Sequence, residues 1–111
     1  MESKRRTVIE PEDGICALVN VFTVEPAKQQ ALIDLLDLAT EEVMRHQSGF
    51  ISANIHRSPD GRHVVNYGQW ETAEALQSML RNPEARVHMN RAAGMATFQP
   101  VLCRVVSAHH V

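Results

Sequence analysis

Short apolar runs alternate along the chain with longer stretches whose apolar residues recur at helical spacing. The runs 15–24, 50–58, 62–71 and 98–108 are rich in β-branched and aromatic residues, which favours strands. After the first run, Pro26 suits the first position of a helix. The apolar residues that follow it form one helical stripe, made of Leu32, Leu35, Leu36, Ala39 and Val43.

Capping signals predict two further helices before the last strand. Thr72 can cap a helix over residues 72–80. Asn82 and Pro83 break that helix and start another, which Gly94 closes. The resulting order, β-α-β-β-α-α-β, predicts an α+β, ferredoxin-like fold: a four-stranded antiparallel sheet with the helices on one face.

The helices can cover only one face of such a sheet, yet the other face is also apolar. In each strand, residues of one parity share a face. The odd-numbered set contains Ala17, Val19, Val21, Ile51, Ala53, Ile55, Val65 and Tyr67. An apolar face of this size is rarely left in water. We therefore expect two copies to pack sheet against sheet, as a homodimer that forms a dimeric α/β barrel.

Composition and charge narrow the possible partners. The 111 residues suit one domain, which we place at 14–111 after a flexible polar tail at 1–13. The net charge is −2, and no basic stripe alternates with aromatic residues, which argues against nucleic acid. No apolar run is long enough to cross a membrane, and the N-terminus does not resemble a secretory signal.

The two cysteines favour a reducing compartment. Cys16 and Cys103 each lie inside an apolar run, as buried thiols do, and no spacing typical of a metal site accompanies them. We therefore expect a cytoplasmic protein without a bound metal.

The strand HVVNYGQW at 63–70 holds the first candidates for a functional site. Asn66 interrupts its apolar run, and Trp70 is the chain's single tryptophan. Because strand side chains alternate, the amide and the indole point to the same face.

The loop of the predicted hairpin decides which neighbours share this face. With a three-residue loop at 59–61 and Gly61 in a left-handed conformation, Ser58 pairs with Arg62. His56, Asn54 and Phe50 then oppose Val64, Asn66 and Trp70, respectively. A loop of two or four residues would reverse the parity and separate His56 from Asn66. We favour the three-residue loop because it leaves the other face uniformly apolar.

Two polar residues outside the hairpin complete the set. Asn20 lies between valines in the first strand, and His88 lies in the third helix. A structural role explains each of the candidate residues alone at least as well: a satisfied amide for an asparagine, a core position for Trp70 and a surface or core position for His88. Together they indicate an apolar pocket with a few converging polar groups, which is typical of a small-molecule site.

Several chemistries lack their motifs in this chain. It has no glycine-rich phosphate loop, GxSxG elbow or HExxH pair. An enzyme built on this sequence would therefore hold a reactive substrate and would not use a strong nucleophile of its own.

The segment SGFISANIHRSPDGRHVVNYGQWET resembles the centre of the antibiotic biosynthesis monooxygenase family. It is most similar to the small cofactor-independent members that oxidise aromatic polyketides to quinones, and NVFTVEPAKQQALIDLL resembles their first strand and helix. The resemblance implies a ferredoxin-like monomer, a dimer with packed sheets, no cofactor, and a small aromatic substrate that reacts with molecular oxygen.

The same resemblance implies roles for individual residues. Asn66 and Trp70 match cavity residues that stabilise a deprotonated substrate, and His56 is suited to moving its proton. The cavity tyrosine of that branch falls at Leu76, and its third-helix arginine is matched by Arg86, by Arg91 or by neither. The remaining expected substrate contacts are Asn20, Asn54, Phe50 and His88.

Two alternatives stay open. Leu76 and the uncertain arginine would also suit a non-catalytic dimeric binding or stress-response protein with a vestigial pocket. Haem-degrading relatives of the same fold carry residues matched by Asn20 and His88, but Met79 replaces their tryptophan, which argues against haem.

Overall fold

The computed structural model describes residues 5–11 and 14–111. Its strands and α-helices follow the predicted order: β1 (Cys16–Val24), α1 (Gln29–Glu42), β2 (Phe50–Arg57), β3 (His63–Trp70), α2 (Ala73–Leu80), α3 (Pro83–Ala93) and β4 (Ala96–Cys103). Short 3-10 turns at Pro26–Lys28 and Met44–His46 flank α1.

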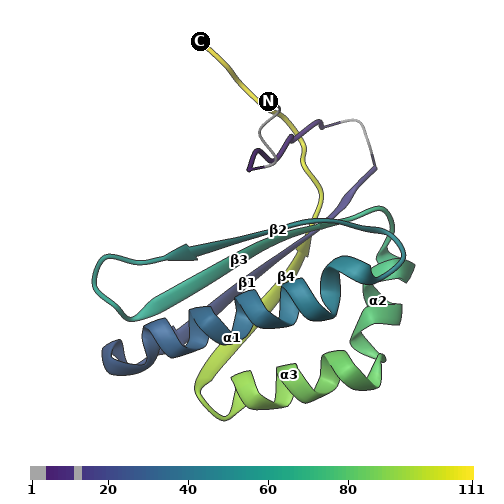
Figure 1. Cartoon of the computed structure of the whole chain (residues 1–111). Coiled ribbons are helices and arrows are strands. Elements are labelled where there is room, and N and C mark those ends of the chain that lie inside the picture. The colour runs from purple at the N-terminus through teal and green to yellow at the C-terminus, as the bar shows by residue number, and fades with distance from the viewer. Residues whose placement is uncertain (1–4, 12–13) are drawn as a thin grey trace.

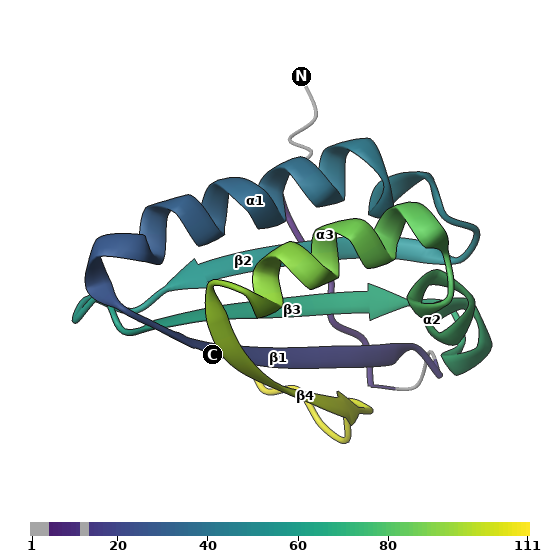
Figure 2. The same ribbon diagram turned by 90° about the horizontal axis from the view of Figure 1, so that it is seen from below.

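The strands form one antiparallel sheet in the order β2-β3-β1-β4, with all three helices on one side (Figure 1). This arrangement confirms the predicted ferredoxin-like fold. Figure 2 shows that α1 and α3 lie over the β2 and β3 half of the sheet, while β1 and β4 extend beyond α3. The helices therefore cover the sheet unevenly.

The core between sheet and helices follows from the apolar stripes of the helices. Leu32 of α1 packs in one cluster with Phe22 and Val64. Leu76 of α2 packs in a second cluster with Trp70, towards the other end of the sheet. Because each cluster takes residues from both layers, burial of the stripes fixes the helices on the sheet.

The predicted caps are present. The Thr72 hydroxyl accepts a hydrogen bond from the Ala75 N–H at 3.0 Å and starts α2. The Asn82 Oδ1 accepts from the Glu84 N–H at 2.8 Å and starts α3. Each cap satisfies donors that the helix itself cannot pair.

The last strand is shorter than predicted and begins earlier. We expected it at 98–108, but β4 runs from Ala96, opposite Val24, to Cys103, opposite Ala17. Because β1 begins at Cys16, the chain after Cys103 has no strand to pair with. Apolar composition alone could not reveal this limit.

The three-residue loop predicted for the hairpin is wrong. The Ser58 N–H donates to the His63 carbonyl at 3.1 Å, so the loop holds the four residues 59–62. Gly61 is left-handed as predicted, with φ of 79°. The parity of β2 is therefore reversed, and Ile55 instead of Asn54 pairs with Asn66.

Side-chain hydrogen bonds explain why the loop holds four residues. The Asp60 carboxylate accepts from the Ser58 hydroxyl at 2.6 Å and from the Arg62 N–H at 2.9 Å. These bonds lower the pKa of Asp60. From outside the hairpin, the Gln29 amide donates to the carbonyls of Ser58, at 3.1 Å, and His63, at 3.0 Å. The start of α1 thus fixes both ends of the loop.

A bulge at Ile51 corrects the parity at the other end of β2. The pairing moves from Ser52 with Gln69 to Phe50 with Trp70, so one residue of β2 is unpaired. Phe50 and Trp70 consequently meet on the helix side, as predicted. Their rings stand almost perpendicular, with centroids 5.4 Å apart.

The sheet face away from the helices, which we call the open face, differs from the prediction only in β2. The expected residues of β1 and β3 lie there, but β2 contributes Ser52, Asn54 and His56 instead of Ile51, Ala53 and Ile55. The N-terminal segment crosses this face: Thr7 bonds Asn54, and the Gln69 amide donates to the Val8 carbonyl at 2.9 Å. The tail predicted at 1–13 includes residues 1–4 and 12–13, which lie outside the described part of the chain.

Candidate active site

An apolar cavity of about 120 Å³ lies between the helices and the sheet. Its walls come from β1, β2, β3, β4 and all three helices, and none of the described residues that line it is Asp, Glu, Lys or Arg. An engineered apolar cavity of about 150 Å³ holds one benzene molecule. The space therefore suits one aromatic ring in surroundings without a fixed charge.

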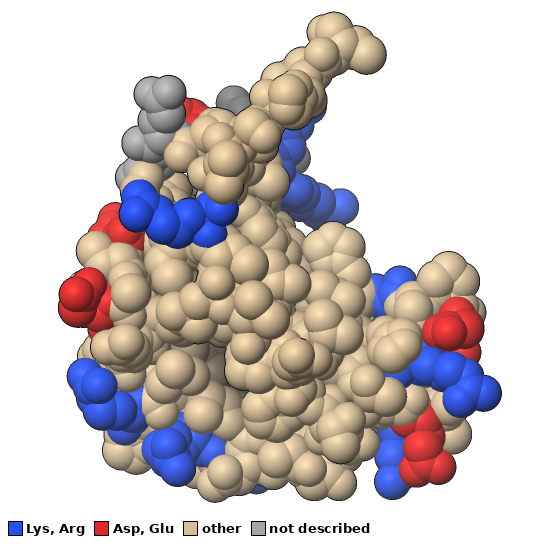
Figure 3. Space-filling view, turned by 180° about the vertical axis from the view of Figure 1, so that it is seen from behind, with Lys and Arg blue, Asp and Glu red and all other residues tan. Residues whose placement is uncertain are grey.

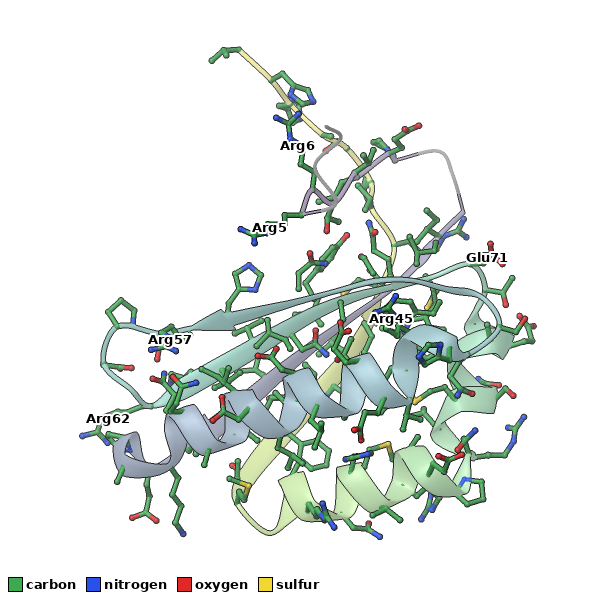
Figure 4. All side chains as sticks on the ribbon, in the orientation of Figure 1. Arg5, Arg6, Arg45, Arg57, Arg62 and Glu71 are labelled. Atoms are coloured by element: carbon green, nitrogen blue, oxygen red, sulfur yellow. The ribbon has the colours of Figure 1, made fainter. Side chains whose placement is uncertain are left out.

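The charged side chains of the described residues lie outside this space. Arg57 and Arg62 lie at the hairpin end, and Arg5 and Arg6 lie on the open-face side (Figure 4). β4 is an edge strand of the sheet. Figure 3 views the molecule from behind: the middle of this surface is uncharged and hollowed, and charged groups lie around it.

Two asparagines lie side by side on the sheet wall of the cavity. Asn20 of β1 and Asn66 of β3 are direct cross-strand partners. The Oδ1 atoms of both are buried and have no hydrogen-bond partner among the described residues. Buried polar groups are normally paired, and leaving one unpaired costs about 1–3 kcal/mol. This pair of amides is therefore available to a ligand.

His88 reaches the cavity from the opposite, helical wall. Ala85 and Ala92, three residues before and four after it, are buried, so that face of α3 lies close to the sheet. The Nδ1 atom of His88 is buried without a partner in the described chain. Among the described residues, only four side-chain nitrogen or oxygen atoms are buried without a hydrogen-bond partner, and three of them belong to Asn20, Asn66 and His88. Their concentration around one cavity marks it as the site.

Trp70 and Phe50 form the aromatic end of the cavity. Trp70 is 3% exposed and rests edge-on against Phe50. Its indole Nε1 lies 3.8 Å from the point that a Cβ on Gly68 would occupy. Because Gly68 also lines the cavity, the absence of a side chain there leaves space beside the indole N–H.

Filling that space should reduce binding without disturbing the fold. A methyl group on Gly68 would meet its neighbours at 3.7 Å or more, an ordinary contact. We expect Gly68→Ala to raise the KM for a ring-sized substrate roughly tenfold, the effect of one methylene in a pocket, and to leave thermal unfolding unchanged or higher. Steady-state kinetics and a melting curve check this. An unchanged KM would place the substrate elsewhere.

His56 and Asn54 do not join the cavity, because the reversed parity of β2 places both on the open face. The His56 Nδ1 lies 3.0 Å from the Asn54 carbonyl, and the Asn54 amide donates to the Tyr67 carbonyl at 2.9 Å. The prediction that they share a face with Asn66 is therefore wrong. Asn66, Trp70, Phe50, Asn20 and His88 are brought together as expected.

Neither expected arginine nor Leu76 lines the cavity. Arg91 is exposed, and Arg86 is exposed with its guanidinium 3.5 Å from the Leu80 carbonyl. Leu76 is fully buried in the core beside Trp70. The site therefore lacks both the arginine and the tyrosine that the resemblance implied. Gly68 also lines the cavity and is not among the predicted site residues, although it shares the parity of Asn66 and Trp70.

The site does not fit haem. Met79 lines the cavity where the haem-degrading relatives carry tryptophan. Space for about one aromatic ring is also far smaller than a tetrapyrrole. Among residues 5–11 and 14–111, no group of three or more His, Cys, Asp or Glu side chains could hold a metal ion.

Together, the fold and the cavity define a ferredoxin-like protein with a small apolar site between its sheet and its helices. Residues 15–91 match the family described as Antibiotic biosynthesis monooxygenase, and the chain belongs to this family. Both the predicted family and the predicted fold are confirmed.

Individual relatives agree with this assignment. The chain is 39% identical over 97 residues to tetracenomycin-F1 monooxygenase of Streptomyces glaucescens, with 87% of each chain covered. A crystal structure of a monooxygenase from the gene ActVA-Orf6 of Streptomyces coelicolor, in complex with nanaomycin D, matches with a TM-score of 0.79 and 30% identity, over 92% of this chain and 96% of that one. SnoaB, a cofactor-independent oxygenase from Streptomyces nogalater, shares the fold with a TM-score of 0.69 and 22% identity, over 88% of this chain and 96% of that one.

The helices of the described residues are all too short or too polar to span a bilayer.

Proposed function

We propose that this protein is a cofactor-independent monooxygenase that oxidises a small, electron-rich aromatic substrate of the phenol or quinol type with molecular oxygen. The observation that carries the proposal is the pair of neighbouring amides, Asn20 and Asn66, whose buried Oδ1 atoms have no partner among the described residues, in a cavity whose described lining carries no fixed charge. Two relatives support the same substrate class, since one is a tetracenomycin-F1 monooxygenase and the structure of another holds nanaomycin D.

The residues of the cavity suit this reaction. A deprotonated phenol is electron-rich enough to give an electron to oxygen. The amides of Asn20 and Asn66 and the indole N–H of Trp70 are neutral donors that can hold the phenolate oxygen. The apolar walls exclude water, which strengthens these hydrogen bonds. One O2 then converts one phenol to a quinone, with one oxygen atom entering the product and the other leaving as water.

An oxygen-electrode assay tests the proposal. Metal-free and flavin-free protein is mixed with a panel of anthrones and hydroquinones in the presence of a chelator. We expect oxygen uptake above the uncatalysed rate and one O2 per substrate. One labelled oxygen atom from labelled O2 should appear in the quinone formed from an anthrone, or in the hydroxyquinone formed from a hydroquinone. Heat-unfolded protein is the control. Tight binding of the panel without oxygen uptake would instead support a non-catalytic binding protein.

We also infer a homodimer that forms through the open face. Val19, Val21, Val65 and Tyr67 remain partly exposed there, and Val101 of β4, opposite Val19, is 46% exposed. An apolar surface of this kind marks an interaction site on a soluble domain. In this dimer, the open face of one copy would pack against the open face of a second copy of the chain.

Sedimentation should show a dimer at micromolar concentration. Val65→Lys places a charge at the centre of the open face and should weaken association at least about tenfold, because burying an unpaired ammonium is costly. Val87→Lys, on an exposed valine of α3, is the matched control and should leave the dimer intact. A wild-type protein that stays monomeric would rule out this interface.

A cytoplasmic location follows as part of the proposal. Cys16 and Cys103 are free thiols, as is usual in a reducing compartment. Burial and the nearby Cys103 thiol raise the pKa of Cys16, which keeps it protonated and unreactive near neutral pH.

A further inference from the structure

We propose that His88 is the base that accepts the phenolic proton of the substrate. This inference rests on the proposed function and assigns its proton-transfer step. Of the described residues that line the cavity, only His88 carries an imidazole, the side chain most often used as a general base near neutral pH. The remaining polar lining residues are asparagine, serine, threonine and tryptophan, which cannot serve as a base at that pH.

The surroundings of His88 leave its imidazole free to take up a proton. Nδ1 is buried without a partner, and no other described residue bonds either ring nitrogen. A histidine held by a carboxylate is oriented and favoured in its charged form, but no Asp or Glu of the described residues lines this cavity. The neutral ring therefore keeps one nitrogen available as an acceptor.

Charge balance inside the cavity supports the same role. Ionising a phenol there without a counter-charge would bury a lone anion, which is costly. When His88 takes the proton, the O–H bond of the phenol breaks and its electron pair stays on oxygen, while an N–H bond forms on the imidazole. The phenolate and the imidazolium then face each other with no net change in charge, and Asn20 and Asn66 on the sheet wall can hold the phenolate oxygen.

An anaerobic absorption spectrum tests this step separately from oxygen chemistry. The probe is a dihydroxynaphthalene whose phenol groups are neutral in the assay buffer. We expect the red-shifted phenolate band when it binds the wild type without oxygen. His88→Gln should bind the probe, as fluorescence quenching of Trp70 would show, but should not produce the band.

Kinetics supply a second readout. We expect His88→Gln to lower kcat about 100-fold or more, the usual contribution of a general base, with little change in KM. The loss should shrink to less than about tenfold for the dichloro derivative of the probe, which ionises without help. Free imidazole should restore part of the activity of His88→Gly. His46→Gln, at an exposed histidine outside the cavity, is the matched control.

The outcomes separate this inference from the proposed function. The inference is overturned if the wild type gives no phenolate band, whether it fails to bind or fails to ionise the probe, or if the band is equally strong in His88→Gln. A normal band without oxygen uptake by the wild type would overturn the monooxygenase function and leave the base assignment standing. If melting curves show His88→Gln unfolded, His88→Asn replaces it.

Discussion

Replacing Asn66 with alanine is expected to lower kcat/KM about 100- to 1,000-fold, the usual effect of removing one donor from an anion-stabilising site. The protein should nevertheless remain folded. The Asn66 amide makes no hydrogen bond to another described residue, and its Oδ1 is buried and unpartnered. Alanine therefore removes an unsatisfied group, and the free energy of unfolding should change by no more than about 1 kcal/mol.

The matched control is the same substitution at Asn82. This asparagine caps α3 through bonds to the Glu84 and Ala85 N–H groups, so Asn82→Ala should cost about 1 kcal/mol of stability and spare the activity. Oxygen uptake and urea unfolding of both variants measure the two effects. Full activity in Asn66→Ala would show that the cavity amides do not hold the substrate.

The second large effect is expected at Leu76. This side chain is fully buried and packs with Trp70 and Met79, so Leu76→Ala should lower the free energy of unfolding by about 2–5 kcal/mol. Small domains are stabilised by only about 5–15 kcal/mol in total, so the loss is a large fraction. It should also loosen Trp70 at the cavity wall and reduce oxygen uptake.

Urea unfolding measures this loss. Leu38→Ala is the control, because Leu38 of α1 is 44% exposed and should tolerate truncation at a cost below about 1 kcal/mol. A loss of less than about 1 kcal/mol at Leu76 would mean that it is not tightly packed, and would return it to the cavity lining that the family resemblance implied.

The parts of the fold that the sequence predicts correctly depend on local rules. The caps at Thr72 and Asn82 require only a side chain and the next turn of helix. Asn66 and Trp70 share the cavity because strand alternation holds over four residues within β3. Predictions of this kind need no knowledge of neighbouring elements.

The failures depend on contacts between distant segments. Gln29, far from the hairpin in sequence, bonds both ends of its loop and helps to fix the four-residue length that places His56 on the open face. The bulge at Ile51 then restores the pairing of Phe50 with Trp70, so the predicted pairing is correct although the loop is not. No periodicity in the sequence shows where a strand holds one extra residue.

The uneven cover of the sheet sets the way in which this site can discriminate between ligands. Phe98 of β4, the edge strand beyond the reach of α3, lines the cavity and is also 43% exposed. A closed cavity limits the total size of a ligand. A pocket that is open at one end limits only the width of the part of the ligand that lies inside it. The site should therefore select aromatic ligands by the substituents on the ring that lies inside the pocket. It should accept ligands with different numbers of fused rings, because the additional rings can extend past Phe98.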